Sequence, residues 1–217
     1  MTHFDVLRSK ALENYGIVTS SIAADLGLRT NEVVRFCQDG RLMRTGYGTY
    51  RLADYTPTRL TRFAEAIAVV GEGSYVFGRS ALMLCDLLPY RTGAICVATG
   101  QRVRRALPNW IELKKAPRND VCIEFGRIPS QSPERALAVC MDRLSAEQLK
   151  EVEHACKESE LLSSVQRQAV LEQLGIEESL ADAAEEAAYE ARMAAVVERG
   201  RIDTVPLGDT PHRVHRE

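Results

Sequence analysis

Long apolar runs are missing from this 217-residue sequence, in which no window approaches the roughly 20 apolar residues that a membrane-spanning helix requires. Residues 1–6 show no charged segment leading into an apolar core, so we expect no secretory signal. Cys-x-x-Cys pairs are also missing, because the six cysteines stand apart, mostly within apolar patterns, at positions 37, 85, 96, 122, 140 and 156. We therefore expect reduced thiols, a cytoplasmic location and no contact with a membrane.

Residues that commonly carry catalysis are scarce as well. The chain has four histidines, and none lies in a turn that would predict a Ser-His-Asp arrangement. His154 and Cys156 are two apart on an expected helix, so their side chains point in different directions. His212 and His215 fall in an expected disordered tail. We expect no bound metal and no cofactor.

The formal net charge of −2 conceals an uneven distribution of charge. Residues 1–118 contain 17 Lys/Arg and 10 Asp/Glu, whereas residues 119–217 contain 11 Lys/Arg and 20 Asp/Glu. A basic front half and an acidic rear half suit a protein that meets phosphate groups with one end only.

Residues 17–28 have the pattern of the first half of a helix-turn-helix. Thr19 or Ser20 can cap a helix by accepting backbone N–H bonds, and Gly27 supplies the turn after it. Apolar residues at helical spacing are expected to face inward: Ile22, Ala23 and Leu26.

Residues 29–40 follow as the expected recognition helix, ending at Gly40. We expect Val33, Val34 and Cys37 to pack inward. The outer face then carries Asn31, Glu32, Arg35 and Gln38, with Arg29 and Thr30 at the helix start. Asn, Gln and Arg match the adenine and guanine edges of a major groove, so this pattern predicts binding to double-stranded DNA.

A basic hairpin completes the N-terminal pattern. Residues 42–45 and 49–52 alternate inward and outward around Gly46-Tyr47-Gly48. A wing of this kind beside a recognition helix predicts a winged helix-turn-helix, with Arg44 and Tyr47 placed to touch phosphate or minor groove. The alternative is a small helical domain of the same pattern used for protein contact.

The rest of the chain predicts a mixed α/β domain. Pro57 marks a boundary after the hairpin. Pro133 suits the first turn of a helix that follows the turn at 129–135. We expect helices at 59–70, 80–88, 134–144, 146–156 and 162–174, strands at 94–99, 110–114 and 121–125, an Ala- and Glu-rich helix at 177–199, and a disordered tail at 201–217.

A second basic region lies within residues 90–118, which hold seven basic side chains and one acidic one. Its centre is Arg102-Val103-Arg104-Arg105, and we expect Arg102, Arg104 and Arg105 to contact the DNA backbone. The alternative is a solvated loop whose charges serve solubility. Trp110 is expected to belong to the core.

Three patches carry a resemblance to a known family. The first is residues 40–52, a short basic strand running to a Gly-x-Tyr-Arg ending. The second is Gly78-Arg79-Ser80-Ala81-Leu82, and the third is residues 128–137, which include Ser-Pro-Glu-Arg. In this order and spacing they resemble the AbiEi-type antitoxins of type IV, abortive-infection toxin–antitoxin systems. The family often has an Asp soon after the third patch, where this chain reads Ala138-Val139-Cys140 before Asp142.

The resemblance implies a two-domain antitoxin. Residues 1–54 would form a winged helix that binds an operator and represses its own operon. Residues 55–175 would form an α/β domain that counteracts a nucleotidyltransferase toxin without a stable complex. Residues 176–217 would add an acidic helix and tail.

Two alternatives to the antitoxin remain open. One is a stand-alone transcriptional regulator without a toxin partner. The other is a nucleotidyltransferase-like enzyme, because Gly78-Arg79-Ser80 precedes a helix as a phosphate-binding turn does. That chemistry needs converging carboxylates, usually from an Asp-x-Asp pair, and none follows here. Asp86 is expected within an apolar helix, while Glu112, Asp120 and Glu124 are scattered, so we expect no enzyme.

Overall fold

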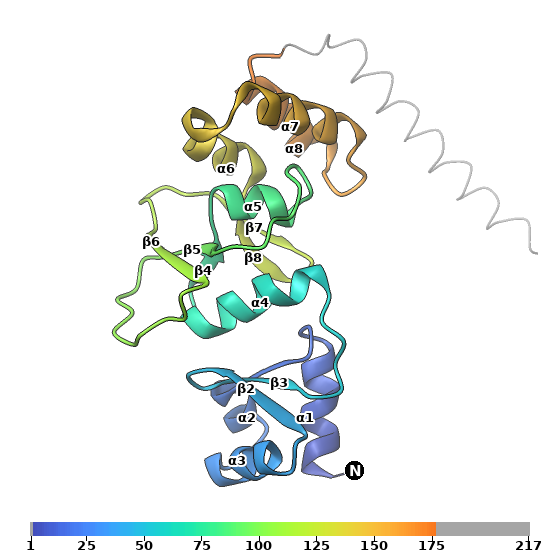
Figure 1. The fold of residues 1–217 in the computed structure, drawn as a ribbon, viewed down its shortest axis with the longest axis vertical. Helices are drawn as coiled ribbons and strands as arrows, with labels where there is room; N and C mark the ends of the chain where they lie inside the picture. The colour runs from blue at the N-terminus through green and yellow to red at the C-terminus, as the bar shows by residue number, and fades with distance from the viewer. Residues whose placement is uncertain (1, 177–217) are drawn as a thin grey trace, which may run out of the picture. The chain divides into compact units, whose positions relative to one another are not determined.

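The structure, a computed structural model, describes residues 2–176. The helix expected at 177–199 and the tail expected at 201–217 therefore lie outside the described residues. The N-terminal segment contains helices and short strands (Figure 1), in the order α1 (His3–Leu12), β1 (Ile17–Thr19), α2 (Ser20–Asp25), α3 (Thr30–Gln38), β2 (Leu42–Gly46) and β3 (Thr49–Leu52).

Local capping explains where α2 and α3 begin. The Thr19 hydroxyl accepts a hydrogen bond from the Ile22 backbone, as expected of an N-cap. Gly27 has a φ of +76°, a conformation that glycine adopts without steric cost, and it turns the chain from α2 into α3. At the start of α3 the Glu32 carboxylate accepts the Arg29 backbone N–H at 2.9 Å.

Strands β1, β3 and β2 form an antiparallel sheet in that order. The β2–β3 hairpin agrees with the sequence expectation, with a bulge between Arg44 and Gly46. The β1 strand was not expected, because three residues beside a helix cap carry no alternation of their own. Its pairing with β3 joins positions 30 or more residues apart, such as Val18 and Tyr50.

A small apolar core holds this sheet to the helices. Val33 of α3 is buried at 3% exposure, whereas Val34 is 43% exposed, so the expectation that Val34 packs inward was wrong. Cys37 is half-buried. The other buried members of the core come from all the surrounding elements: Leu7, Ala11, Val18, Ala23, Leu28, Leu42, Tyr50 and Leu52.

A five-stranded sheet of order β6-β5-β4-β8-β7 follows in the chain. Its pairs are mixed: β4–β5 and β7–β8 are antiparallel, while β4–β8 and β5–β6 are parallel. This confirms a fold of mixed α and β structure. The strands are β4 (Ser74–Val76), β5 (Ile95–Thr99), β6 (Ile111–Lys115), β7 (Cys122–Phe125) and β8 (Ile128–Gln131).

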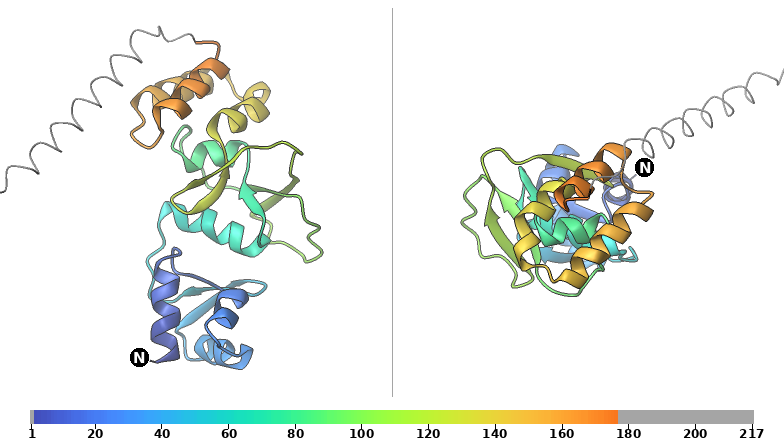
Figure 2. Two further views of the ribbon diagram at one scale, coloured as in Figure 1. Left: turned by 180° about the vertical axis from the view of Figure 1, so that it is seen from behind. Right: turned by 90° about the horizontal axis from the view of Figure 1, so that it is seen from above.

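Helices α4 (Arg59–Val70) and α5 (Arg79–Leu84) share one hydrophobic cluster with the sheet. Alternate strand residues, such as Val76, Val97 and Ile128, supply the sheet's part of this cluster. Helices α6 (Pro133–Cys140), α7 (Ala146–Glu158) and α8 (Ser164–Gln173) continue the cluster beyond α5 (Figures 1 and 2). Within residues 2–176, no helix combines the length and hydropathy needed to cross a membrane.

Several boundaries differ from expectation. The helix expected to run to Leu88 ends at Leu84, so Asp86 does not lie within a helix. Asp86 instead has a φ of +61° and pairs with Arg59 at 2.7 Å. The helix that begins at Pro133 ends at Cys140, followed by a single 3₁₀ turn. Part of the segment expected to be a turn at 129–135 is strand β8, paired on both sides.

Candidate nucleic-acid interface

The outer face of α3 carries polar side chains that the protein itself leaves unused. Asn31, Arg35 and Gln38 are exposed, and within the described part of the chain their side chains make no hydrogen bond or ion pair. Arg29 and Thr30, at the helix start, are exposed as well. These donors and acceptors are available to a ligand.

Glu32 behaves differently from its neighbours on α3. Its carboxylate accepts the Arg29 backbone N–H and lies 3.1 Å from Nδ1 of His3. The hydrogen bonds from Arg29 and His3 hold the pKa of Glu32 below its usual value. Glu32 therefore serves the start of the helix rather than its outer face, where the sequence pattern placed it.

Aromatic contacts fix the inner side of α3. The Phe4 and Phe36 rings meet edge to face at 5.0 Å between centroids. The Arg41 guanidinium lies over both rings, 5.0 Å from the Phe4 centroid and 6.0 Å from the Phe36 centroid. This packing leaves the opposite side of α3 as the free surface.

The hairpin tip lies at the end of β2, tied to the start of α2. The carbonyl of Gly48 accepts the Ser20 backbone N–H at 2.8 Å and the Ser20 hydroxyl at 3.3 Å. Tyr47 at the tip is 71% exposed. Arg44 is exposed, and its Nε donates to the Gly46 carbonyl at 3.2 Å, within the hairpin itself. The hydrogen bonds from Ser20 hold the hairpin tip in place. The hairpin therefore presents the aromatic ring of Tyr47 and the guanidinium group of Arg44 at its surface.

Helix α4 supports the other side of the hairpin. The Thr49 hydroxyl donates to the Ala68 carbonyl at 3.3 Å, and Arg51 pairs with Glu65 at 3.6 Å. Both members of that ion pair are largely buried, with side chains 18% and 11% exposed. Gly46 lies so near α4 that an added Cβ would stand 2.7 Å from a methyl group of Val69. The hairpin thus packs against α4 through both of its strands.

The basic loop at 102–105 meets the end of the same helix. Arg105 donates to the Val69 carbonyl at 2.7 Å and to the Val70 carbonyl at 2.6 Å. These carbonyls belong to the last turn of α4, which has no intrahelical donors for them. Arg102 and Arg104 are exposed. Arg105 therefore has a structural role that its place in a basic run did not indicate.

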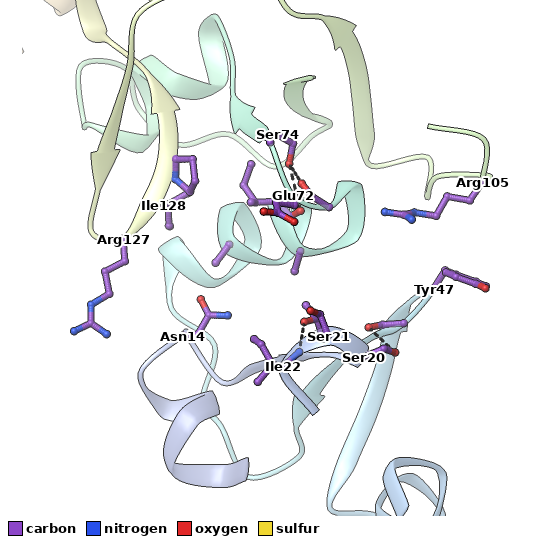
Figure 3. A pocket seen from close by; sticks show the side chains of 18 residues that line it. Asn14, Ser20, Ser21, Ile22, Tyr47, Glu72, Ser74, Arg105, Arg127 and Ile128 are labelled. Carbon is purple, nitrogen blue, oxygen red and sulfur yellow. Dashed lines mark hydrogen bonds between the residues drawn. The ribbon is translucent and has the colours of Figure 1, made fainter. Parts of the chain in front are cut away.

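Two clefts lie beside the hairpin tip and the end of α4. One, of about 610 Å³, is lined by Tyr47 of the hairpin and by Arg102, Arg104 and Arg105. The structure therefore brings the expected loop residues to the hairpin tip, although more than 50 positions separate them. The other cleft, of about 570 Å³, lies among the start of α2, the hairpin and α4 (Figure 3), where Tyr47 and Arg105 approach its rim.

A partly buried hydrogen-bond network links polar groups of the five-stranded sheet. The Tyr75 hydroxyl donates to Asp120 at 2.6 Å, and the Gln131 amide donates to the same carboxylate at 2.8 Å. Gln131 also accepts the Gly78 backbone N–H at 2.9 Å. Burial, with the adjacent Asp120, raises the pKa of Tyr75 above its usual value. This network joins β4, β8 and the start of α5, and it has a structural role.

Trp110 and the metal-ligating types of residue contribute little to the candidate interface. Trp110 is half-buried beneath the Arg62 guanidinium, 4.7 Å from the ring centroid. Among residues 2–176, no three His, Cys, Asp or Glu side chains gather as a metal site. Val34 is the residue of the α3 surface that sequence reasoning missed, although its spacing of three from Asn31 could have found it.

Comparisons with known proteins give little to set beside this geometry. No family model matches the chain, and no curated protein matches it. Among solved structures, the chain is similar to the RV2827C protein from Mycobacterium tuberculosis, at 13% identity and a TM-score of 0.40, over 79% of this chain and 76% of that one. At this level the similarity assigns neither a family nor a function.

Proposed function

We propose that the protein binds double-stranded DNA as a winged helix-turn-helix, with α3 in the major groove and the β2–β3 hairpin as the wing. The observation that carries the proposal is the stripe of unpartnered base-reading side chains on α3, namely Asn31, Arg35 and Gln38. Arg44 and Tyr47 on the wing would contact phosphate or the minor groove.

The basic loop extends this interface. Arg102 and Arg104 share a cleft with Tyr47 of the wing, so DNA that passes the wing tip would meet these guanidinium groups next. Contacts of this kind are made to the phosphate backbone and add affinity without selecting sequence. We assign Arg105 to the support of the loop, since its donors already face α4.

The biological role that we propose is that of an antitoxin and autorepressor of a type IV toxin–antitoxin operon. Support comes from the resemblance of residues 40–52, 78–82 and 128–137 to AbiEi-type antitoxins. The partner would be a nucleotidyltransferase toxin that is counteracted without a stable complex. Growth of cells with an inducible copy of a nucleotidyltransferase-like toxin encoded beside this chain tests this role, since the chain should restore growth. A stand-alone regulator would bind its operator and leave growth arrested.

DNA binding is tested first by selecting bound duplexes from a random library with the full chain. Titrations of the enriched sequence with Asn31→Ala and Arg35→Ala should show affinity weakened by about 1–3 kcal/mol each, and a less specific site. Arg135→Ala, which removes an exposed arginine from α6, is the matched control and should bind as the wild type does. Enrichment of no sequence, or equal affinity for all four proteins, contradicts the proposal.

A further inference from the structure

The exposed stripe of α3 contains one apolar side chain. Asn31, Val34, Arg35 and Gln38 are spaced at i, i+3, i+4 and i+7, so they lie within an arc of about 100° on the helix. All four are exposed, with Val34 at 43%. The isopropyl group of Val34 therefore stands among the three polar side chains that face the proposed groove.

The packing of α3 shows that Val34 is not needed for the core. The adjacent Val33 is only 3% exposed and fills the core position at this level of the helix. Phe36 anchors the same inner side, under the Arg41 guanidinium. A β-branched residue at an exposed helix position gains nothing from helix propensity, in which valine ranks below alanine and the long polar residues. Val34 is therefore available for contact with a ligand, and it stands among the polar side chains of the proposed interface.

The chemistry of the major groove indicates which ligand group that is. The C5-methyl of thymine is the apolar group that a base pair of unmodified DNA presents there. Asn31 and Gln38 match adenine, whose partner in the same base pair is thymine. Val34 lies one helical turn from both residues, so its methyl groups and a thymine methyl can meet in the same or the adjacent base pair.

We propose that Val34 selects thymine, by van der Waals contact of its isopropyl group with the C5-methyl, within a site in which Asn31 or Gln38 reads adenine. This inference rests on the proposed function and adds to it one base of the recognised sequence. Valine has no hydrogen-bonding group, so its selection acts through the methyl alone. Deoxyuridine, which differs from thymidine by that methyl, is therefore the sharpest probe.

The experiment uses the full chain and the duplex enriched from the random library. Each thymine of the site is replaced in turn by deoxyuridine, and the dissociation constant is measured by fluorescence anisotropy. For the wild type, one replacement should weaken binding about fourfold, the value of one buried methyl-sized group. For Val34→Ala the same replacement should leave the dissociation constant unchanged. For Val34→Thr, which keeps one methyl, it should weaken binding by less than in the wild type.

Val165→Ala is the matched control, because Val165 is 75% exposed on α8 and belongs to no proposed contact. It should show the wild-type response to every replacement. If the wild type is indifferent to all the replacements, or if Val34→Ala keeps the wild-type response, the inference is wrong while DNA binding stands. If no duplex is enriched or bound at all, the proposed function fails and the inference fails with it.

Discussion

Arg102, Arg104 and Arg105 are near neighbours in the sequence but differ in what their side chains contact. The Arg105 guanidinium donates to the carbonyls of Val69 and Val70, at the end of α4. All three residues are exposed, but the side chains of Arg102 and Arg104 make no hydrogen bond or ion pair within residues 2–176, and they line a cleft with Tyr47 of the hairpin. A basic run therefore combines one residue that holds the loop in place with two that present charge.

This division predicts opposite outcomes for single substitutions. Arg105→Ala should lower the free energy of unfolding by about 1–2 kcal/mol, because the terminal carbonyls of α4 lose a charged donor. Arg102→Ala and Arg104→Ala should leave unfolding unchanged but weaken DNA binding and reduce the salt dependence by about one ion each. Urea denaturation and titrations at two salt concentrations measure both effects. Loss of stability in Arg102→Ala, or none in Arg105→Ala, would reverse the assignment.

At the scale of residues, sequence alone could place Asn31, Arg35 and Gln38 on one exposed face, because helical spacing fixes which side chains share a side. The same spacing places Val34 on that face, but an apolar residue is normally assumed to face the core, so Val34 was expected to pack inward. Nor could it show that Arg105 donates to carbonyls of α4, because these acceptors lie some 35 positions earlier in the chain. Periodicity predicts faces, whereas tertiary contacts decide which charged groups are already satisfied.

At the scale of elements, the approach of β2 to α4 depends on Gly46. A methyl group at this position would stand 2.7 Å from Val69, closer than real carbon atoms approach. Gly46→Ala should therefore destabilise the protein by about 1–3 kcal/mol, as overpacking does, and should shift the wing away from α4.

Gly93→Ala is the control for this substitution, since a Cβ there would meet nothing within 4 Å. Thermal melting followed by circular dichroism should show a lower midpoint for Gly46→Ala alone. Equal melting of both variants would mean that the wing and α4 adjust freely at their contact.

The sequence predicted the longer elements well and missed the shortest strands. Helix α4 has the expected bounds, because twelve residues with an apolar stripe carry a strong helical signal. Strand β4 has three residues, and β8 contains Pro129 with buried Ser130 and Gln131, which read as a polar turn. Their pairing with each other spans some 50 residues, so no local pattern contains it.

At the scale of the whole molecule, buried thiols predict how stability depends on pH. Burial raises the pKa of Cys85 to about 12 and the pKa values of Cys96 and Cys140 to about 11. An unfolded thiol ionises near its ordinary pKa of about 8.5. Between that value and about 11, the unfolded chain therefore loses protons that the folded chain retains, and the free energy of unfolding falls as pH rises.

Urea denaturation between about pH 8 and pH 10 measures this decline, which is at most about 1.4 kcal/mol per pH unit for each thiol. The Cys85 thiol also donates to the Ala81 carbonyl at 3.2 Å, a bond that requires its proton. Cys85→Ala should therefore show a shallower decline than the wild type, whatever its stability at pH 8. A midpoint that stays constant over this range would contradict the prediction.

The last turn of α4 has a consequence for the spacing of an operator. Its carbonyls accept hydrogen bonds from Thr49 of the wing and from Arg105 of the basic loop, and Val69 lies against Gly46. One helix end thus sets the separation between the hairpin and the basic loop, the two surfaces that we propose contact DNA. In the proposed complex, the number of base pairs between the bases under α3 and the phosphates under the loop would then be constant. Lengthening that interval by one base pair moves the phosphates by about 3.4 Å, a step that the shared support does not follow.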